Sequence, residues 1–359
     1  MGSACILISL HAEPTIITMR ILILIYVFSV TLLTVRSEMP EKQLFRVMSY
    51  NVENYFDCVD DSLTKDEEYL PGGMRGWNYS RYEQKQANIA RVIVAVGGWN
   101  PPALVGLCEV ESRRALIDLT RYATLKSLKY AFVHHESPDT RGVDVALLYQ
   151  PDVFQVLDEK TVAISFPDAP HSTTRDLLYV RGQLPAGDTL HVFVCHFPSR
   201  LGGELESEQK RNHVASVLRQ EIVTVFFEDS DANIIVMGDF NDYPDNESME
   251  KVLQANFPVA PFELSKLYNL MFPLHLEGKG THKHEGDWGA LDQIIVSGSL
   301  LDVNTGFYTL SDAVHIFDED FLSEDDLKFL GKQPFRTYAG MKYNEGFSDH
   351  FPVYIDLWY

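Results

Sequence analysis

Cysteine is scarce in this sequence: only four of its 359 residues are cysteines. These four, Cys5, Cys58, Cys108 and Cys195, show neither the paired spacing of a zinc site nor the density of a disulfide framework. Cys108 and Cys195 lie within apolar runs, where cysteine packs as a small hydrophobic residue. The sequence therefore excludes a disulfide-rich scaffold and a cysteine-ligated metal domain.

Positive charge is also scarce, because 30 lysines and arginines stand against 51 acidic residues, giving a formal net charge of −21. This balance excludes a protein that coats nucleic acid through bulk electrostatic attraction. It does not exclude a nuclease, because acidic residues can bind a divalent cation that reverses the local field. Several basic residues lie near the motifs described below. They either surround the mouth of a binding site with positive charge or are ordinary solvated surface charges. They are Arg141, Arg175, Arg200, Lys210, Arg211 and Arg336.

Long hydrophobic runs are missing except near the N-terminus, where residues 21–33 are almost continuously apolar. That run is shorter than the ~20 residues that a membrane span requires. With its basic and small flanking residues, it predicts a signal peptide over residues 1–37, cleaved after Ser37. Met19 is an alternative start, which would make residues 1–18 an extension. We therefore expect export to the periplasm or the extracellular space without a stable membrane anchor; the rival interpretation is an uncleaved anchor.

The rest of the chain, residues 38–359, is predicted to be one domain, since no repeat and no linker interrupts it. Strands are expected at residues 44–50, 103–108, 131–134, 143–149, 153–157, 177–184, 189–195, 234–237, 291–296 and 352–357, and helices at 82–96, 113–125 and 204–227. Residues 57–79 and 303–346 are expected to be irregular. Many strands are joined by short turns, unlike the regular alternation of a doubly wound sheet. The pattern favours two mixed or antiparallel sheets packed face to face, with helices outside.

Polar residues capable of chemistry stand at the ends of these expected strands. Gly238-Asp239-Phe240-Asn241 follows one apolar run, and Ser348-Asp349-His350 precedes the last one. Similar positions hold Asn51, Asn54, Glu109, Asp144, His196 and Asp292. Side chains at such places are held by rigid backbone but remain open to solvent. Carboxylate and amide oxygens are the ligands that Mg²⁺ prefers, so the pattern indicates metal-assisted phosphoester hydrolysis.

This ordered set of motifs resembles the endonuclease/exonuclease/phosphatase superfamily, over about residues 45–355. That superfamily includes deoxyribonuclease-I-like and exonuclease-III-like nucleases, sphingomyelinases and inositol-polyphosphate phosphatases. The resemblance implies an α/β fold, a four-layered sandwich of two packed mixed β-sheets flanked by helices. It also implies a metal-dependent phosphoric ester hydrolase.

The resemblance further implies roles for residues of the motifs. Asn51, Glu109 and Asp349 match metal-binding positions, with Mg²⁺ as the expected cofactor and Mn²⁺ as an alternative. Asp239 matches the residue that orients or deprotonates the attacking water, and Asn241 would position that water or donate to the phosphoryl oxygen.

Two histidines are implied to contact the phosphate. His196 and His350 would donate hydrogen bonds that stabilise the extra charge of the transition state. Asp292 matches the carboxylate partner of His350, and Asp144, on a looser match, is the candidate partner of His196. Taken singly, each acidic residue could instead be a turn former, and His196 could be a core histidine.

Further residues are candidates for substrate binding. Guanidinium groups bind phosphate through paired hydrogen bonds, which makes three arginines candidates: Arg141, Arg175 and Arg200. Trp288 either stacks on a base or sugar or is an ordinary buried tryptophan. His282, His284 and Asp287 form either a second metal site or a solvated loop, and residues 335–338 could line the mouth.

The sequence thus predicts an exported, monomeric, metal-dependent phosphoesterase that hydrolyses its substrate by in-line attack of water. A nuclease is the leading expectation, with nucleic acid as substrate. The first alternative is an enzyme for lipid headgroups or small phosphate esters, since a fold does not choose among substrates. The second alternative is a binding module that kept the scaffold. Its mark would be a lost catalytic carboxylate or histidine, and none is lost in the sequence.

Overall fold

The computed structural model describes residues 42–121, 124–200 and 202–359. The predicted signal peptide, residues 1–37, lies outside the described residues, and so does its cleavage site. Leu44–Tyr359 pack together as one unit. Within the described ranges, no helix combines the length and the apolar character needed to cross a membrane.

The first sheet contains six strands in the order β14-β19-β1-β2-β4-β3. Its strand β1 (Leu44–Tyr55) pairs antiparallel with β19 (Val353–Trp358) and parallel with β2 (Leu104–Val110). The other strands are β3 (Ala131–His134), β4 (Asp144–Tyr149) and β14 (Tyr308–Ile316). Because Ser49 pairs with Val353, the first and last motifs of the chain meet at one end of this sheet.

The second sheet contains seven strands in the order β5-β6-β7-β8-β13-β10-β9. Its strands are β5 (Gln155–Val162), β6 (Leu177–Gln183), β7 (Thr189–His196), β8 (Asn233–Asp239), β9 (Ala255–Asn256), β10 (Leu267–Asn269) and β13 (Asp292–Ser297). β7 runs parallel to β8, and β8 runs antiparallel to β13. In this register Asp239 pairs with His196 on one side and with Asp292 on the other, so three motif residues stand in one row.

The two sheets pack face to face through an apolar core. Val47 and Val353 of the first sheet join Met237 and Ile294 of the second in one buried cluster. Gly106 allows the close approach, because a Cβ atom there would lie 3.0 Å from the Met237 side chain. Each buried aliphatic side chain contributes roughly 1.5–3 kcal/mol, so this interface contributes strongly to the stability of the fold.

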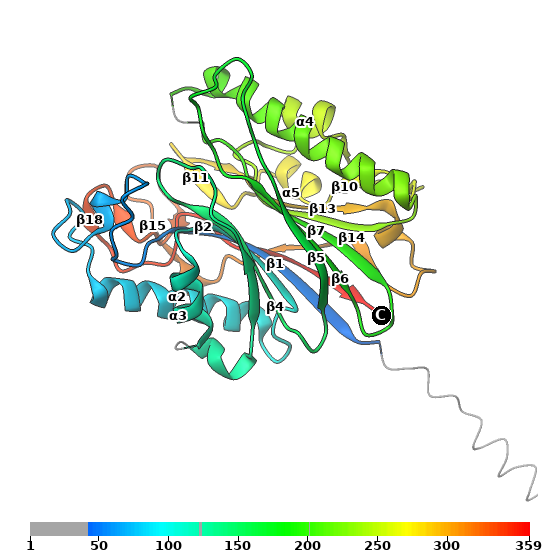
Figure 1. Cartoon of the computed structure of the whole chain (residues 1–359), viewed down its shortest axis with the longest axis horizontal. Coiled ribbons are helices and arrows are strands. Elements are labelled where there is room, and N and C mark those ends of the chain that lie inside the picture. Colours follow the sequence, from blue (N-terminus) through cyan, green and yellow to red (C-terminus); the bar gives the residue numbers. More distant parts are fainter. Residues whose placement is uncertain (1–41, 122–123, 201) are drawn as a thin grey trace, which may run out of the picture. The chain divides into compact units, whose positions relative to one another are not determined.

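Helices cover the two outer faces and complete a four-layered α/β sandwich. α2 (Tyr79–Gly97) and α3 (Arg113–Arg121) pack on the first sheet, where Ile89 and Ile93 share a cluster with Met48. α4 (Glu204–Glu228) packs on the second sheet in the same way, as Figure 1 shows. The fold predicted from the resemblance is confirmed. The short elements are η1 (Glu67–Tyr69), η2 (Thr124–Leu128), η3 (Ser248–Val252), α5 (Phe272–Leu276), β11 (His282–His284), β12 (Asp287–Gly289), η4 (Gly298–Leu301) and η5 (Asp320–Leu322).

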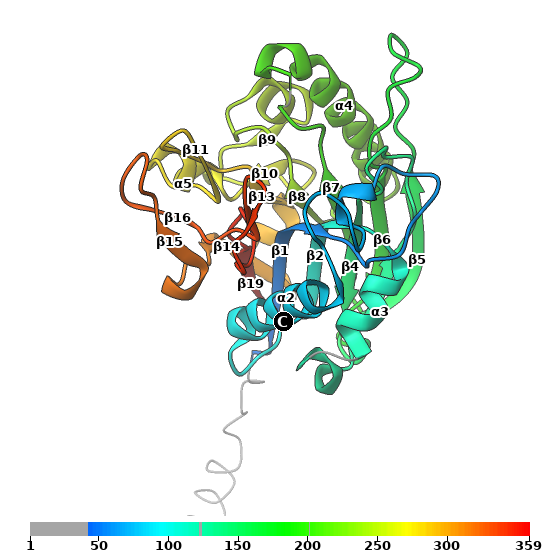
Figure 2. The same cartoon turned by 90° about the vertical axis from the view of Figure 1, so that its left-hand side faces the viewer.

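Residues 303–346 are more ordered than the sequence indicated. β14 forms an edge of the first sheet, although a register shift between Thr309 and Val314 interrupts its pairing with β19. Two small hairpins follow: β15 (Ser323–Asp325) with β16 (Lys332–Pro334), and β17 (Tyr338–Ala339) with β18 (Lys342–Tyr343). Figure 2 shows β15 and β16 in orange, close to β11. The irregular alternation of buried and exposed residues in β14 explains why the sequence did not reveal this strand.

Candidate active site

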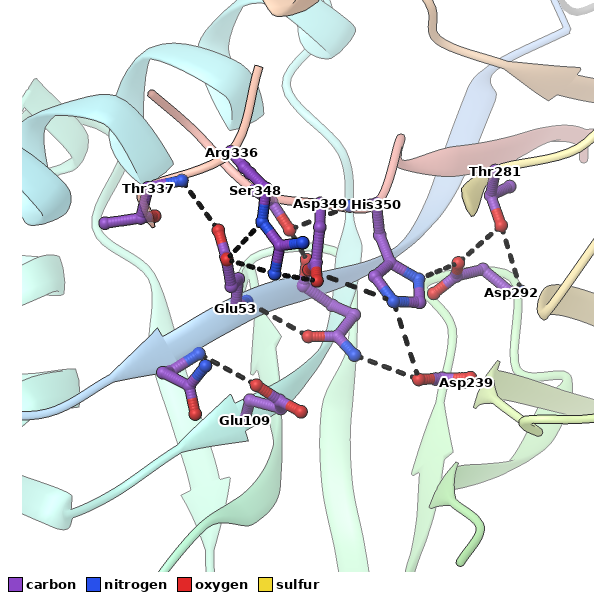
Figure 3. Close-up of polar contacts among 12 residues, drawn as sticks. Glu53, Glu109, Asp239, Thr281, Asp292, Arg336, Thr337, Ser348, Asp349 and His350 are labelled. Carbon is purple, nitrogen blue, oxygen red and sulfur yellow. Dashed lines mark hydrogen bonds and ion pairs between the residues drawn. The ribbon is translucent and has the colours of Figure 1, made fainter. Parts of the chain in front are cut away.

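The predicted motifs converge at one end of the two facing sheets (Figure 3). His196 and Asp239 end the parallel strands β7 and β8, and Asp292 begins β13 beside them. From the first sheet, Asn51 lies in the last part of β1 and reaches Asp239, its Nδ2 donating to Oδ2 over 2.9 Å. Side chains of both sheets therefore share one polar centre.

The backbone around this centre adopts conformations that are rare for residues with a side chain. Four non-glycine residues have positive φ angles between 51° and 66°: Glu53, Asn54, Glu109 and Asn241. Such strain gathers at functional sites, where the surrounding structure holds it in place. Gly238 has φ 144°, and a Cβ atom there would lie 1.8 Å from the carbonyl oxygen of Cys195. Only glycine fits at this point, directly before Asp239.

His350 is held by a buried carboxylate. Its Nδ1 lies 2.7 Å from Asp292 Oδ2, which also accepts a hydrogen bond of 2.6 Å from Thr281 Oγ1. Its Nε2 faces Asp239 Oδ2 at 4.0 Å and Asp349 Oδ1 at 3.9 Å. Burial lowers the pKa of His350, but the neighbouring carboxylates of Asp292 and Asp239 raise that pKa well above its ordinary value. The ring is therefore a charged donor at neutral pH, aimed into the polar centre.

His196 has the opposite electrostatic character. Its Nε2 lies 3.6 Å from Asp239 Oδ2 and 3.9 Å from Glu109 Oε1. Burial lowers the pKa of His196 well below its ordinary value, and the positive charges of Arg175, Arg141 and His350 lower it further. The two imidazoles therefore differ in charge, with His196 neutral and His350 protonated.

Asp144 does not orient His196, which corrects the predicted pairing. Asp144 Oδ2 lies 3.3 Å from His134 Nε2, and Oδ1 accepts hydrogen bonds from the Ser137 amide, at 3.0 Å, and the Ser137 hydroxyl. Nδ1 of His196 has no hydrogen-bond partner in the described part of the chain. Asp144 begins β4 beside β3, and its two carboxylate oxygens contact His134 and Ser137.

Asp239 is placed to act as a base. Its Oδ1 accepts the Asn241 amide at 2.9 Å, and its Oδ2 accepts the Asn51 side chain at 2.9 Å. Burial raises the pKa of Asp239 to about 6, with Asp292 adding to the rise and His350 opposing it. A carboxylate with this pKa is ionised at neutral pH yet more basic than an exposed aspartate.

The predicted metal ligands present hard oxygen atoms beside this base. Glu109 Oε2 accepts the Asn54 amide at 2.9 Å, while Oε1 is 3.7 Å from Arg141 Nη2 and 3.9 Å from His196 Nε2. That oxygen has room for a further ligand, because both nitrogens lie beyond hydrogen-bond distance. Two further groups of possible metal ligands both contain His350. Asp239 and Asp292 form one group with it, and His282 and Asp349 form the other. Within each group the ligand atoms lie within 4.8 Å of one another. The carboxylate oxygens of Glu109, Asp239 and Asp349 are donors of the kind that a hard divalent cation prefers.

Sequence reasoning missed Glu53, which links two distant parts of the site. The buried Glu53 carboxylate lies 3.0 Å from Arg336 Nη2 and accepts the Thr337 amide at 2.7 Å. The same Arg336 nitrogen donates to Asp349 Oδ2 at 2.8 Å. Burial raises the pKa of Glu53 to about 7, with Asp349 adding to the rise, while Lys85 and Arg336 oppose it. Glu53 lies in the first motif, but only the three-dimensional structure reveals its partner Arg336.

The three candidate arginines have different environments. Arg141 is 46% exposed and lies near Glu109, as expected for a residue at the mouth. Arg175 is buried and donates to Asp139 at 3.0 Å and to the Phe197 carbonyl at 2.6 Å. Arg200 is also engaged, with hydrogen bonds to the Asn241 carbonyl, Asp242 and Asn246. Arg175 and Arg200 therefore position loops of the site instead of presenting free guanidinium groups.

The remaining candidates, Trp288 and His282, have different neighbours. Trp288 stacks on Phe351 at 5.5 Å between ring centroids, which agrees with the interpretation of a packed tryptophan. The His282 ring lies 4.8 Å from that of His350. A cavity of about 790 Å³ opens beside it, lined by Asn241, His282, His284, Asp287 and Arg141 among others. This volume is typical of a small-ligand site.

Comparison with known proteins agrees with the observed fold. A sequence model of the Endonuclease/Exonuclease/phosphatase family matches residues 46–358. No curated protein sequence matches the chain significantly. TDP2 from D. rerio, complexed with single-strand DNA product, superposes with TM-score 0.53 at 14% identity, covering 88% of this chain and 99% of its own.

Two bacterial structures show a comparable likeness. An endonuclease/exonuclease/phosphatase from Bacteroides vulgatus gives TM-score 0.53 at 15% identity, covering 88% of this chain and 99% of its own. A mannosyl-6-phosphatase from Bacteroides thetaiotaomicron gives TM-score 0.52 at 14% identity, covering 87% of this chain and 99% of its own. At these identities the likeness establishes the fold, and substrates differ among the neighbours.

Proposed function

Because the chain belongs to the endonuclease/exonuclease/phosphatase family, we propose that it is a divalent-metal-dependent phosphoesterase whose leading activity is that of a nuclease. The observation that carries the proposal is the meeting of Glu109, Asp239 and His350 in one polar centre, with the distances given above. We extend the proposal to export, on the basis of the apolar segment at residues 21–33, and we propose that the exported protein is a monomer.

The metal would be held by oxygen atoms of Asn51, Glu109 and Asp349. These are hard donors, as Mg²⁺ and Mn²⁺ require, and the free Oε1 of Glu109 supports the assignment. When bound, such an ion neutralises charge on a nonbridging phosphate oxygen and makes a coordinated water more acidic. Arg336 ties Asp349 to Glu53 and thereby fixes the direction of the Asp349 carboxylate.

The chain's own residues then divide the remaining work. Asp239 takes the proton of the attacking water, since its pKa of about 6 leaves it ionised and basic. Asn51 and the Asn241 amide hold that carboxylate in place. The charged Nε2–H of His350 donates to the phosphoryl oxygen as negative charge grows on it. Water attacks in line with the departing oxygen, so no covalent enzyme intermediate forms.

The substrate class divides into two candidates. A nuclease is supported by the family and by TDP2, which was complexed with single-strand DNA product. A second candidate is a small phosphate ester, which the cavity of about 790 Å³ beside His282 favours because it is sized for one compact ligand. The net charge of −21 also disfavours extended contact with a nucleic acid backbone.

A substrate panel tests the proposal. The purified protein is offered plasmid DNA, RNA, sphingomyelin, inositol phosphates, a sugar phosphate and bis-p-nitrophenyl phosphate, with Mg²⁺ or Mn²⁺ and with EDTA. We expect hydrolysis that EDTA abolishes, with the highest kcat/KM on a nucleic acid. His350→Ala is the matched control and should lower turnover by ~10²-fold or more. A protein that binds these compounds but hydrolyses none of them would contradict the proposal and support a binding module.

Export is tested separately. Cell fractionation should recover the protein outside the cytoplasm, and N-terminal sequencing of the recovered protein should begin at residue 38. Recovery in the membrane fraction with residues 21–33 retained would contradict the cleaved signal peptide.

A further inference from the structure

A second cluster of metal-ligand side chains lies outside the candidate active site, around the loop between β3 and β4. One ligand atom from each of His134, Glu136 and Asp144 lies within 4.8 Å of the others. His134 ends β3 and Asp144 begins β4, so two of the three groups stand on rigid strands. The Glu136 side chain is 64% exposed, which leaves the cluster open to solvent.

The two buried members of this cluster carry atoms without hydrogen-bond partners. His134 Nε2 and Asp144 Oδ2 are buried and unpartnered within the described residues, and their side chains are 1% and 2% exposed. The two atoms lie 3.3 Å apart, farther than the ~2.7–2.9 Å of a charge-assisted N–H···O bond. Zinc bonds of about 2.0–2.2 Å in tetrahedral geometry separate neighbouring ligand atoms by about 3.3–3.6 Å. The observed spacing is that of two ligands on one ion.

The surroundings of the cluster attract cations. A cavity of about 520 Å³ adjoins Glu136, and the described residues that line it include no lysine, arginine or histidine. Its acidic lining consists of Asp57, Asp60, Asp61, Glu111, Glu136 and Asp139. A bound cation would relieve this crowding of carboxylates.

We propose that His134, Glu136 and Asp144 bind one Zn²⁺ ion, with solvent completing the coordination. One imidazole together with two carboxylates suits Zn²⁺ better than Mg²⁺ or Ca²⁺, which prefer oxygen ligands throughout. The ion would join both ends of the loop that carries Arg141, whose guanidinium lies 3.7 Å from Glu109. Its role is to hold this loop at the mouth, and its presence does not depend on which phosphoester the protein hydrolyses.

The test measures zinc binding in a chain whose active site has been disabled. Glu109→Gln combined with His350→Ala is the parent, because Glu109 is an assigned ligand of the active-site metal and His350 belongs to both other groups of potential metal ligands in the described chain. Isothermal titration with Zn²⁺ in excess Mg²⁺ should show one equivalent bound to this parent. Adding Glu136→Gln or His134→Gln should weaken the affinity at least tenfold. Co²⁺ should give a d–d absorption band in the parent that Glu136→Gln removes.

Matched controls make the result decisive. His135→Gln removes the neighbouring histidine, which is 39% exposed and pairs with Glu159, and should leave zinc affinity within twofold of the parent. Because Glu136 is exposed, its substitution should leave the melting temperature in EDTA unchanged, which separates ligand loss from unfolding. Zinc affinity in the Glu136→Gln and His134→Gln chains equal to that of the parent, or no zinc bound by the parent, would overturn the proposal.

Discussion

Replacing Asp292 by asparagine removes the charge that holds His350 in its protonated form. Asp292 is fully buried, and its Oδ2 receives both the His350 ring at 2.7 Å and Thr281 Oγ1 at 2.6 Å. A hydrogen bond that involves a charged group contributes roughly 1.5–3 kcal/mol. Since each 1.36 kcal/mol corresponds to a factor of ten in rate, kcat/KM should fall roughly 10- to 150-fold.

The assay is the hydrolysis of bis-p-nitrophenyl phosphate with Mg²⁺, measured as a function of pH. Carboxylates raise the pKa of His350, so the wild-type protein keeps the imidazolium above the ordinary histidine pKa and loses activity only as pH rises through the raised value. In Asp292→Asn that pKa falls, so the alkaline limb of the profile should move to lower pH.

A control variant separates this effect from general disturbance of the site. Thr281→Val removes the hydrogen bond that the Thr281 hydroxyl donates to Asp292 but leaves the carboxylate and His350 paired. The charge beside His350 is kept, so the rate should fall less than in Asp292→Asn and the alkaline limb of the profile should stay in place. A wild-type rate in Asp292→Asn with an unshifted pH profile would refute the assigned role of the pair.

Three further predictions concern metal binding and stability. Mg²⁺ at a hundredfold excess over its Kd should raise the free energy of unfolding by about 2.7 kcal/mol in thermal melts. The Glu109→Gln variant should lose this gain. An equal gain in the wild-type chain and the variant would contradict the assignment of Glu109 as a metal ligand. Gly238→Ala should lose about 3 kcal/mol or more in denaturant titration, because its Cβ would lie 1.8 Å from the Cys195 carbonyl oxygen, and a wild-type midpoint would contradict this steric argument. Burial lowers the pKa of His191 in the folded state, and the positive charge of Arg181 lowers it further. Below about pH 6.5 the unfolded chain therefore binds more protons than the folded chain, and the free energy of unfolding falls. In His191→Asn the side chain can still accept a hydrogen bond from the Tyr179 hydroxyl at the position of Nδ1. The free energy of unfolding of this variant should fall less steeply at acid pH than that of the wild-type chain. Equal slopes in the two chains would contradict the link between the His191 pKa and stability.

The sequence predicted most of the buried strands, because their apolar runs are continuous and bounded by turn residues. Residues 131–134 match β3 in full, and 143–149 differ from β4 by one residue. The edge strand β14 was missed, since a register shift and mixed burial hide its period. Strand-terminal motifs likewise predicted which polar groups would meet, and the structure brings Glu109, Asp239 and His350 together.

The sequence did not reveal which side chains the polar residues of the site contact. Glu53 and Arg336 are 283 positions apart, and no local pattern announces their contact. Asp144 was assigned to His196 on a looser match to the family motifs, whereas in the structure its carboxylate lies beside His134 and Ser137. Arg175 was expected to meet substrate, whereas its guanidinium is occupied by Asp139 and the Phe197 carbonyl. Contacts between segments that are far apart in the sequence depend on the fold, so only the three-dimensional structure reveals them.

The proposed metal-dependent hydrolysis depends on Asp239, which is held between the two sheets and takes a proton from the attacking water. The most direct measurement is kcat/KM for bis-p-nitrophenyl phosphate with Mg²⁺, compared between the wild-type chain and a folded Asp239→Asn variant. Asparagine keeps the shape of the side chain but cannot take a proton, so we expect kcat/KM to fall by ~10²-fold or more. A folded variant that retains the wild-type kcat/KM would contradict it.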